Sequence, residues 1–277
     1  KLKLNINKWI CVELIKTKNL TENFIENYRF DEAAKTIYKF VWNNYCDWYL
    51  ELSKTILSSN NKKEIEEVKK TSGQVFKEIL ILLHPFIPFI TEELWLKNRL
   101  KTKTTKYLMY APWINYQKII KDKKIENVKE IIQLISNIRS FKNELNIKPG
   151  SFIDVSIKNM GESKKRLFLQ NEVVIKKLGR INTILKNDLS KQSANLVISG
   201  QILKLYFDKS IDLSLIRENL TKKQSKIHND LLLVSKKLNN PSFVERAPKH
   251  IVEQEKNIYN DLKINLDKLS LTIKSLK

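Results

Sequence analysis

Apolar and polar residues alternate with three different periods along the chain. Over residues 1–115 the apolar positions recur at a spacing of three and four, which places them on one face of a helix. We expect helices at Lys8–Glu26, Phe30–Leu57 and Glu64–Leu83, and a short one after Pro88. The first stretch is therefore predicted to be a helical bundle.

The second of these helices has the clearest apolar face. Asp31 stands where an N-cap residue would lie. The predicted buried face comprises Ala34, Ile37, Val41, Tyr45, Trp48 and Leu52. Trp42 and Tyr49 lie further round this helix, so we expect them to be better placed to reach a partner.

The middle stretch, residues 116–209, changes from a helical to a strand period. A helix is expected at Lys123–Leu145 and another at Glu162–Leu178. Strands are expected at Phe152–Ile157 and Ile181–Leu185, and a hairpin at Asn195–Ser199 and Gln201–Phe207 around Gly200. These elements predict a small α+β linker domain.

The last stretch, residues 210–277, carries heptad repeats. The first seam is Leu213, Leu220, Ile227 and Val234, and the second contains Val252, Tyr259, Leu266 and Ile273. Two helical runs of equal length, Ile211–Leu238 and Lys249–Leu276, each extend roughly 42 Å at about 1.5 Å per residue. Pro241 and Pro248 interrupt the pattern between them. We expect an antiparallel coiled-coil hairpin, because a turn at the midpoint lets one chain fill its own seam as a monomer. The alternative is a dimerising coiled coil.

The net charge adds a candidate partner. The 277 residues contain 51 Lys and Arg against 30 Asp and Glu, which gives +21. Residues 116–209 alone hold 19 basic and 9 acidic residues, a net charge of +10. A surplus of this size attracts polyanions such as nucleic acid. Lysine outnumbers arginine 44 to 7, a bias that an A/T-rich genome also produces without selection for binding.

Several classes of site are disfavoured. Five glycines form no phosphate-binding loop, and Cys11 and Cys46 with three scattered histidines offer no zinc spacing. We expect no metal, no membrane span, and a reduced, cytoplasmic protein. Carboxylates alternate with lysines as on a solvated surface, so no catalytic residue is assigned. An enzyme with an unfamiliar site is the alternative, which would need a deep pocket with perturbed titratable groups.

Particular segments resemble valyl-tRNA synthetase, in the order expected for that family. Residues 29–34 and 40–51 are similar to its anticodon-binding bundle, and residues 84–95 to a helix junction found in related class I synthetases. Residues 138–150 resemble the segment that follows, and residues 243–248 with 252–256 the tip of the C-terminal arm. The resemblance covers essentially the whole chain.

The resemblance implies a mainly α fold with three parts. These are a helical anticodon-binding domain at 1–115, the α+β linker domain at 116–209 and a tRNA-binding coiled-coil arm at 210–277. It implies tRNA, and specifically tRNA-Val, as the partner. The two ATP-site motifs and the editing domain of the family have no counterpart in the sequence. We therefore expect no cofactor in this chain, because the full enzyme would use ATP and Mg²⁺ in a separate catalytic domain, and we expect no valyl-adenylate synthesis by this chain alone.

Related synthetases fit less well. The isoleucyl enzyme usually ends in a cysteine-rich zinc module, and the leucyl enzyme lacks the long hairpin arm. The equivalent region of such a relative remains one alternative, and a coiled-coil protein-interaction module without RNA is another. For tRNA binding, the candidates in the bundle are Arg29, Lys39, Trp42 and Tyr49. The candidates in the arm are Lys222, Lys223, Lys226, Arg246, Lys249 and Lys256.

Overall fold

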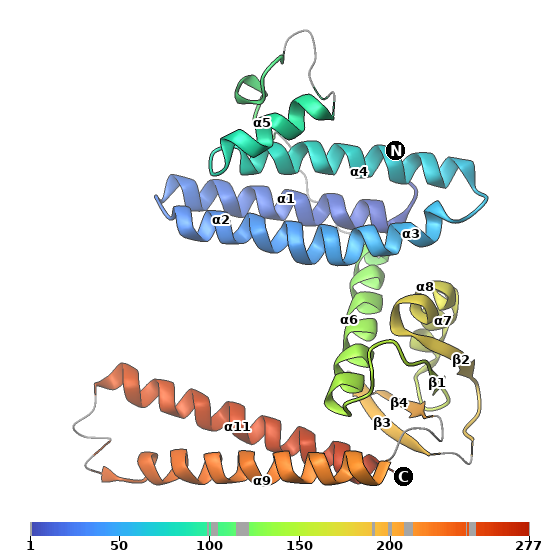
Figure 1. Cartoon of the computed structure of the whole chain (residues 1–277), viewed down its shortest axis with the longest axis vertical. Coiled ribbons are helices and arrows are strands. Elements are labelled where there is room, and N and C mark those ends of the chain that lie inside the picture. Colours follow the sequence, from blue (N-terminus) through green and yellow to red (C-terminus); the bar gives the residue numbers. More distant parts are fainter. Residues whose placement is uncertain are drawn as a thin grey trace. The chain divides into compact units, whose positions relative to one another are not determined.

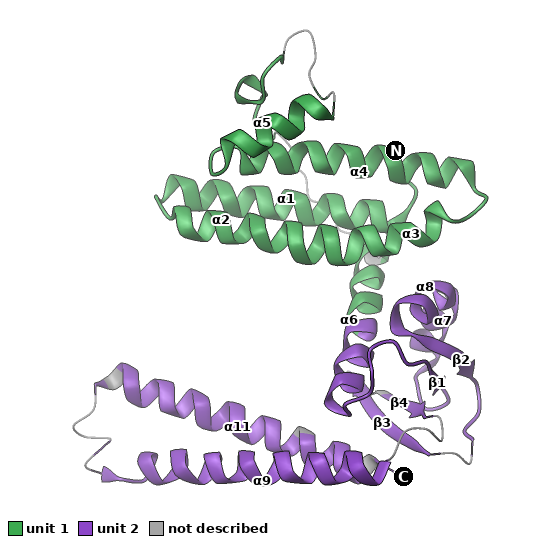
Figure 2. Ribbon diagram, viewed as in Figure 1, with its two compact units in different colours: residues 1–133 green, residues 134–277 purple. Residues whose placement is uncertain are grey.

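The computed structural model of the chain describes residues 2–98, 100, 105–114, 122–189, 192–198, 201–207, 213–241, 243 and 248–276. These residues form helices, a small sheet and a terminal pair of helices (Figure 1). The chain divides into two compact units, residues 1–133 and 134–277 (Figure 2). The boundary falls within helix α6, Lys123–Glu144. In the described part of the chain, no helix is both long enough and apolar enough to cross a membrane.

The first unit is the predicted helical bundle. Its elements are α1 Asn5–Glu26, α2 Phe30–Lys39, the π-helix η1 Phe40–Leu50, α3 Glu51–Leu57, α4 Lys62–Leu83, α5 Pro88–Lys97 and the 3₁₀ turn η2 Leu108–Tyr110. The caps between α2, η1 and α3 are helical, so these three run on as one rod. The four predicted helices are confirmed to within three residues at their starts.

Local chemistry explains most of the helix ends. The Asn61 side chain accepts a hydrogen bond from the Glu64 N–H and caps α4. Pro88 starts α5, where its missing N–H has no consequence. The prediction of Asp31 as an N-cap is wrong, because α2 begins at Phe30 and Asp31 lies in its first turn. A carboxylate there still interacts favourably with the positive end of the helix.

The buried face of the rod differs from the predicted face. Within η1 the buried residues are Phe40, Tyr45 and Tyr49, spaced five and four apart, while Trp48 is only half-buried. A π-helix closes i→i+5 hydrogen bonds, so its buried positions are spaced more widely than in an α-helix. The prediction that Trp48 lies in the core and Tyr49 outside it is therefore wrong.

A chain of two hydrogen bonds, the first buried and the second part-buried, holds Tyr49 in place. The Tyr49 hydroxyl donates to Asn7 Oδ1 at 2.8 Å, and Asn7 Nδ2 donates to Glu67 Oε1 at 2.9 Å. Tyr49 and Asn7 are both fully buried. We call this chain the Tyr49–Asn7–Glu67 relay; it joins η1, α1 and α4.

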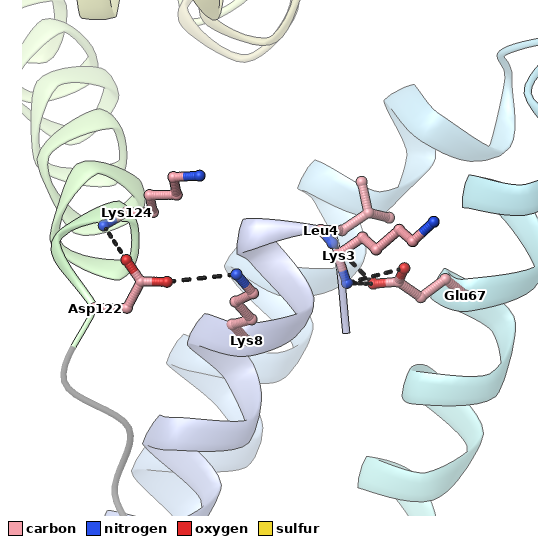
Figure 3. A network of polar contacts seen from close by, with 6 residues as sticks. All are labelled: Lys3, Leu4, Lys8, Glu67, Asp122 and Lys124. Atoms are coloured by element: carbon pink, nitrogen blue, oxygen red, sulfur yellow. Dashed lines mark hydrogen bonds and ion pairs between the residues drawn. The ribbon is translucent and has the colours of Figure 1, made fainter. Parts of the chain in front are cut away.

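Glu67 also anchors the start of the chain (Figure 3). The N–H groups of Lys3 and Leu4 donate to its carboxylate at 2.9–3.2 Å. Burial acts to raise the pKa of Glu67, but the hydrogen bonds from Leu4, Asn7 and Lys3 outweigh it, so the pKa lies below its usual value. In the same view Asp122 accepts from the Lys124 N–H and from Lys8 Nζ, which joins the start of α6 to α1.

The second unit contains a four-stranded sheet in the order β2-β1-β4-β3. The strands are β1 Ile153–Ser156, β2 Ile181–Leu185, β3 Ser193–Ile198 and β4 Gln201–Tyr206. β3 and β4 pair antiparallel, which confirms the predicted pairing on either side of Gly200, although the turn itself lies outside the described residues. β1 pairs antiparallel with β4 and parallel with β2.

The parallel pair requires a crossover, and helices supply it. The predicted helix Glu162–Leu178 is divided at Asn171 into α7 Glu162–Gln170 and α8 Glu172–Gly179. Phe168 and Ile175 are buried, one from each helix, as are Val155 and Leu205 from the central strands. Arg180 leaves α8 in the left-handed conformation (φ 53°) and leads directly into β2. The middle stretch is thus an α+β fold, as predicted.

The last two helices, α9 Leu213–Leu238 and α11 Lys249–Ser275, contact each other along their length. Three contacts fix an antiparallel register: Arg217 to the Leu276 carbonyl at 2.6 Å, Gln224 to Ser270 at 2.8 Å, and Lys237 to Glu255 at 3.0 Å. The mainly α fold with a small α+β part and a terminal helical hairpin is confirmed. The three-part domain division at residues 115 and 209 stays a prediction.

Replacing Tyr49 by Phe tests the relay. The change leaves Asn7 Oδ1 buried without its donor, so we expect the free energy of unfolding to fall by about 1–3 kcal/mol. Urea denaturation followed by circular dichroism measures it. Trp42→Phe is the matched control, expected within about 0.5 kcal/mol of the wild type because Trp42 is exposed. Equal effects of the two changes would contradict the assignment.

Replacing Glu67 by Gln tests the anchored carboxylate through pH. A lowered folded-state pKa gives stability that is present above the unfolded-state pKa of about 4.3 and is lost as pH falls through the folded-state pKa. The stability difference between wild type and Glu67→Gln should therefore be constant above about pH 5.5 and shrink below about pH 4. Urea titrations from pH 3 to 7 measure this difference in the free energy of unfolding. A difference that does not depend on pH would contradict the assignment of the stabilising group as the ionised carboxylate of Glu67.

Candidate nucleic-acid interface

Two exposed aromatic rings form a ledge on the rod of the first unit. Tyr38 and Trp42 are 62% and 56% exposed, and their rings lie parallel, with an interplanar angle of 2° and centroids 6.4 Å apart. Lys39 lies between them in sequence and is exposed. Aromatic faces of this kind stack on unpaired bases, and a neighbouring cation attracts the phosphate.

Tyr49 is not part of this ledge. It was predicted to reach a partner, but it is fully buried and its hydroxyl is engaged by Asn7. Burial raises the pKa of this hydroxyl, so it stays protonated and continues to donate. The expectation that Tyr49 is exposed is wrong, because the wider turn of η1 places this residue in the core.

Arg29 lies at the other end of α2. Its guanidinium packs over the Phe24 ring at 5.2 Å, in the turn where the exposed Tyr28 adopts a φ of 58°. Ten residues separate Arg29 from Lys39, roughly 15 Å at about 1.5 Å per residue. The structure therefore brings Lys39 and Trp42 together but places Arg29 apart from them.

Sequence analysis missed Tyr38. Its spacing of four residues from Trp42 is the available sign, because side chains at i and i+4 are neighbours on a helix. The same spacing joins Tyr45 to Tyr49, whose rings lie 5.7 Å apart in the core. Spacing alone therefore does not separate an exposed pair from a buried one.

The arm presents several of its predicted cations to solvent. Lys222, Lys223, Lys226 and Lys256 are exposed, while Leu220 and Val234 of the seam are buried. Lys222 Nζ lies 2.6 Å from Glu218, an exposed pair of small energetic value. Arg246 and the side chain of Lys249 lie outside the described residues, so their predicted roles stay predictions.

The thiols and histidines provide little for catalysis. Burial raises the pKa of Cys11 to about 11, and burial, with a smaller effect of Asp47, raises that of Cys46, so neither is an activated thiolate. His84 Nδ1 lies 2.8 Å from the Thr91 hydroxyl, which links the ends of α4 and α5. Among the described residues, no group of three His, Cys, Asp or Glu side chains is placed to hold a metal ion.

Comparison with known families gives this arrangement a context. The family described as "Anticodon-binding domain of tRNA ligase" matches residues 7–157, and "Valyl tRNA synthetase tRNA binding arm" matches residues 212–277. The chain belongs to the valyl-tRNA synthetase family. The two matches confirm the resemblance seen in the sequence: this is the anticodon-binding and tRNA-binding-arm region of valine--tRNA ligase.

Individual members of the valyl-tRNA synthetase family align over nearly the whole chain. A protein named Valine--tRNA ligase from Pelagibacter ubique is 51% identical over 275 residues, 99% of this chain and 31% of that protein. The protein of the same name from Bartonella quintana is 37% identical over 278 residues, 100% of this chain and 30% of its own length. The chain thus spans about three tenths of the length of these curated relatives.

Substitutions in the arm test whether packing in its apolar seam holds the two helices together. Leu220→Asp places a charge at a position that is 2% exposed, so we expect the arm to lose helix packing and the chain to lose helicity on mild heating. Leu233→Asp is the control, because Leu233 lies on the same helix and is 60% exposed. Circular dichroism and amide hydrogen exchange of the arm measure both variants. Similar protection in both would show that the seam does not hold the hairpin.

Proposed function

We propose that this chain binds tRNA, and specifically tRNA-Val, with two separate parts. The helical bundle meets the anticodon stem and loop, and the coiled-coil arm lies against the outer corner of the tRNA. The observation that carries the proposal is the arm itself. Its seam is closed within one chain, and Lys222, Lys223, Lys226 and Lys256 remain exposed beside it.

The mechanism is positioning. Lysines bind phosphates and fix the register of the RNA without reading its sequence. In the bundle, the Tyr38–Trp42 ledge stacks an unpaired base while Lys39 holds the adjoining phosphate. In a full valyl-tRNA synthetase this orientation delivers the acceptor end of the tRNA to the catalytic domain.

The remaining parts of the proposal follow from the family. The protein acts as a monomer in the cytoplasm, with the catalytic domain of the enzyme as its second partner. ATP and Mg²⁺ bind in that domain and not in these residues, so this chain by itself forms no valyl-adenylate. Arg29 and, on the arm, Arg246 and Lys249 complete the proposed set of tRNA contacts.

One observation favours an alternative. Six apolar side chains of the arm are 46–63% exposed: Leu215, Leu232, Leu233, Ile258, Ile264 and Leu271. A module that docks another protein would use such residues. The alternative function is therefore protein interaction through the arm without RNA.

A salt titration distinguishes the two functions. Affinity for tRNA-Val is measured at several salt concentrations for the intact chain and for the triple variant Lys222→Gln, Lys223→Gln, Lys226→Gln. Each lost phosphate contact should reduce the slope of log affinity against log salt by about 0.7–0.9. Helicity should hardly change, since Gln is also a good helix former.

A matched control separates the loss of particular phosphate contacts from the loss of total positive charge. The variant Lys62→Gln, Lys63→Gln, Lys69→Gln removes three exposed charges from α4 in the first unit. We expect it to weaken binding much less than the arm variant. Unchanged affinity and slope for the arm variant would remove RNA from the function of the arm and favour protein interaction.

A further inference from the structure

The α+β part of the second unit carries the densest surplus of positive charge in the chain: residues 134–209 hold 14 basic and 6 acidic residues, a net charge of +8 over 76 residues. Residues 1–133 reach the same +8 over 133 residues, and residues 210–277 carry +5 over 68. An A/T-rich genome can also produce such a surplus, so the charge count by itself assigns no role to this part of the chain. The distribution of these cations in the fold is therefore informative.

Strand pairing brings distant cations together. β1 and β2 are parallel, so their carboxyl ends lie at the same edge of the sheet. Lys186 directly follows β2 at this edge, and α7 begins six residues after β1 ends. Figure 1 shows α7 and α8 between the two strands in chain order. In open sheets with parallel strands, this edge is where ligands commonly bind.

A hollow of about 600 Å³ lies at this place. Its lining includes the cations Lys165, Arg166 and Lys186, the amide of Gln170, the carboxylate of Glu162 and the apolar Leu169. The lining residues thus include three basic side chains and one acidic side chain. We call this feature the α7 hollow.

Glu162 forms an ion pair with one of the three cations, and the charge of a second, Arg166, also lowers its pKa. Its carboxylate lies 2.9 Å from Lys165 Nζ, and this hydrogen bond is the main reason that the pKa of Glu162 is lowered. Over the residues that the structure describes, neither Arg166 nor Lys186 forms an ion pair, and both are exposed. The hollow therefore has two exposed cations outside this ion pair, Arg166 and Lys186.

The chemistry of the lining selects phosphodiesters. A guanidinium binds two oxygens of one phosphate, and a lysine ammonium binds a second phosphate as a point charge. Gln170 has both a donor and an acceptor for a ribose hydroxyl, and Leu169, 40% exposed, offers an apolar contact to a sugar or base. Successive phosphates and sugars are the repeating unit of an RNA backbone.

We infer that the α7 hollow binds the phosphodiester backbone of tRNA, so that the α+β domain is a third RNA contact and not a spacer. The inference rests on the proposed function, since it names a further contact for the same ligand. Arg166 and Lys186 are the principal contacts, and Lys165 adds to the local positive potential while it is held by Glu162.

The test is a salt titration of tRNA-Val binding by the intact chain carrying Arg166→Gln and Lys186→Gln. We expect the slope of log affinity against log salt to fall by about 1.4–1.8 for the two contacts. The control is Lys148→Gln with Lys177→Gln. It removes the same charge from two exposed positions of the same unit that do not line the hollow. We expect its affinity to change by less than about twofold. Thermal unfolding of each variant establishes that both are folded.

The outcomes separate this inference from the proposed function. Equal losses of tRNA affinity in the hollow variant and its control would show that only the total positive charge matters, and would overturn the inference. A wild-type slope in the hollow variant, with a reduced slope in the arm variant, would overturn the inference and leave the proposed function standing. Failure of the intact chain to bind any tRNA would overturn the proposed function itself.

Two further measurements locate the contact and identify the anion. A photo-cross-linking residue at Gln170 should join to tRNA, while one at the exposed Val173 of α8 should join much less. Equal yields at the two positions would contradict the inference. Titration with inorganic phosphate, followed by NMR, tests whether the hollow binds a small anion instead. If phosphate saturates the hollow while the hollow variant binds tRNA as tightly as the wild type, the assignment of RNA as the ligand is overturned.

Discussion

The buried hydroxyl of Tyr49 ties the long rod of the first unit to two neighbouring helices. It donates to Asn7, and Asn7 donates in turn to Glu67, so three elements are tied by two hydrogen bonds at 2.8 and 2.9 Å. A buried polar group needs its partner, because leaving it unpaired costs about 1–3 kcal/mol. Tyr49 is buried in the π-helical segment, whereas Trp42 and Tyr38 are exposed on the same rod.

The arm also divides its residues between packing in the seam and exposure to solvent. Its apolar seam closes within one chain, and polar contacts at both ends and the middle fix the register. The seam residues are then committed to packing, and Lys222, Lys223 and Lys226 are left exposed to solvent. Membership of the valyl-tRNA synthetase family supports tRNA as the partner of both bundle and arm.

Much of the fold follows from local patterns in the sequence. Heptads located α9 and α11 to within two residues, because a repeat of seven is sustained over a long range. The strand Ile181–Leu185 was predicted with its observed bounds. The predicted face of the second helix failed at Ala34, Val41 and Trp48, which are only half-buried, and at Tyr49, which is buried. From Phe40 on, a periodicity argument that assumes an α-helix cannot detect the i→i+5 ladder.

The sequence by itself determined the family, the elements and the positive charge, since these depend on residue type and on spacing along the chain. Only the tertiary structure decided that Tyr38 joins Trp42 at the surface and that Tyr49 does not. It alone placed Lys186 near Lys165 and Arg166, which precede it by about twenty residues in sequence. The parallel pairing of β1 and β2 brings these side chains to one hollow. Pairing between strands and burial of a side chain depend on neighbours that are distant in sequence, and no local pattern specifies them.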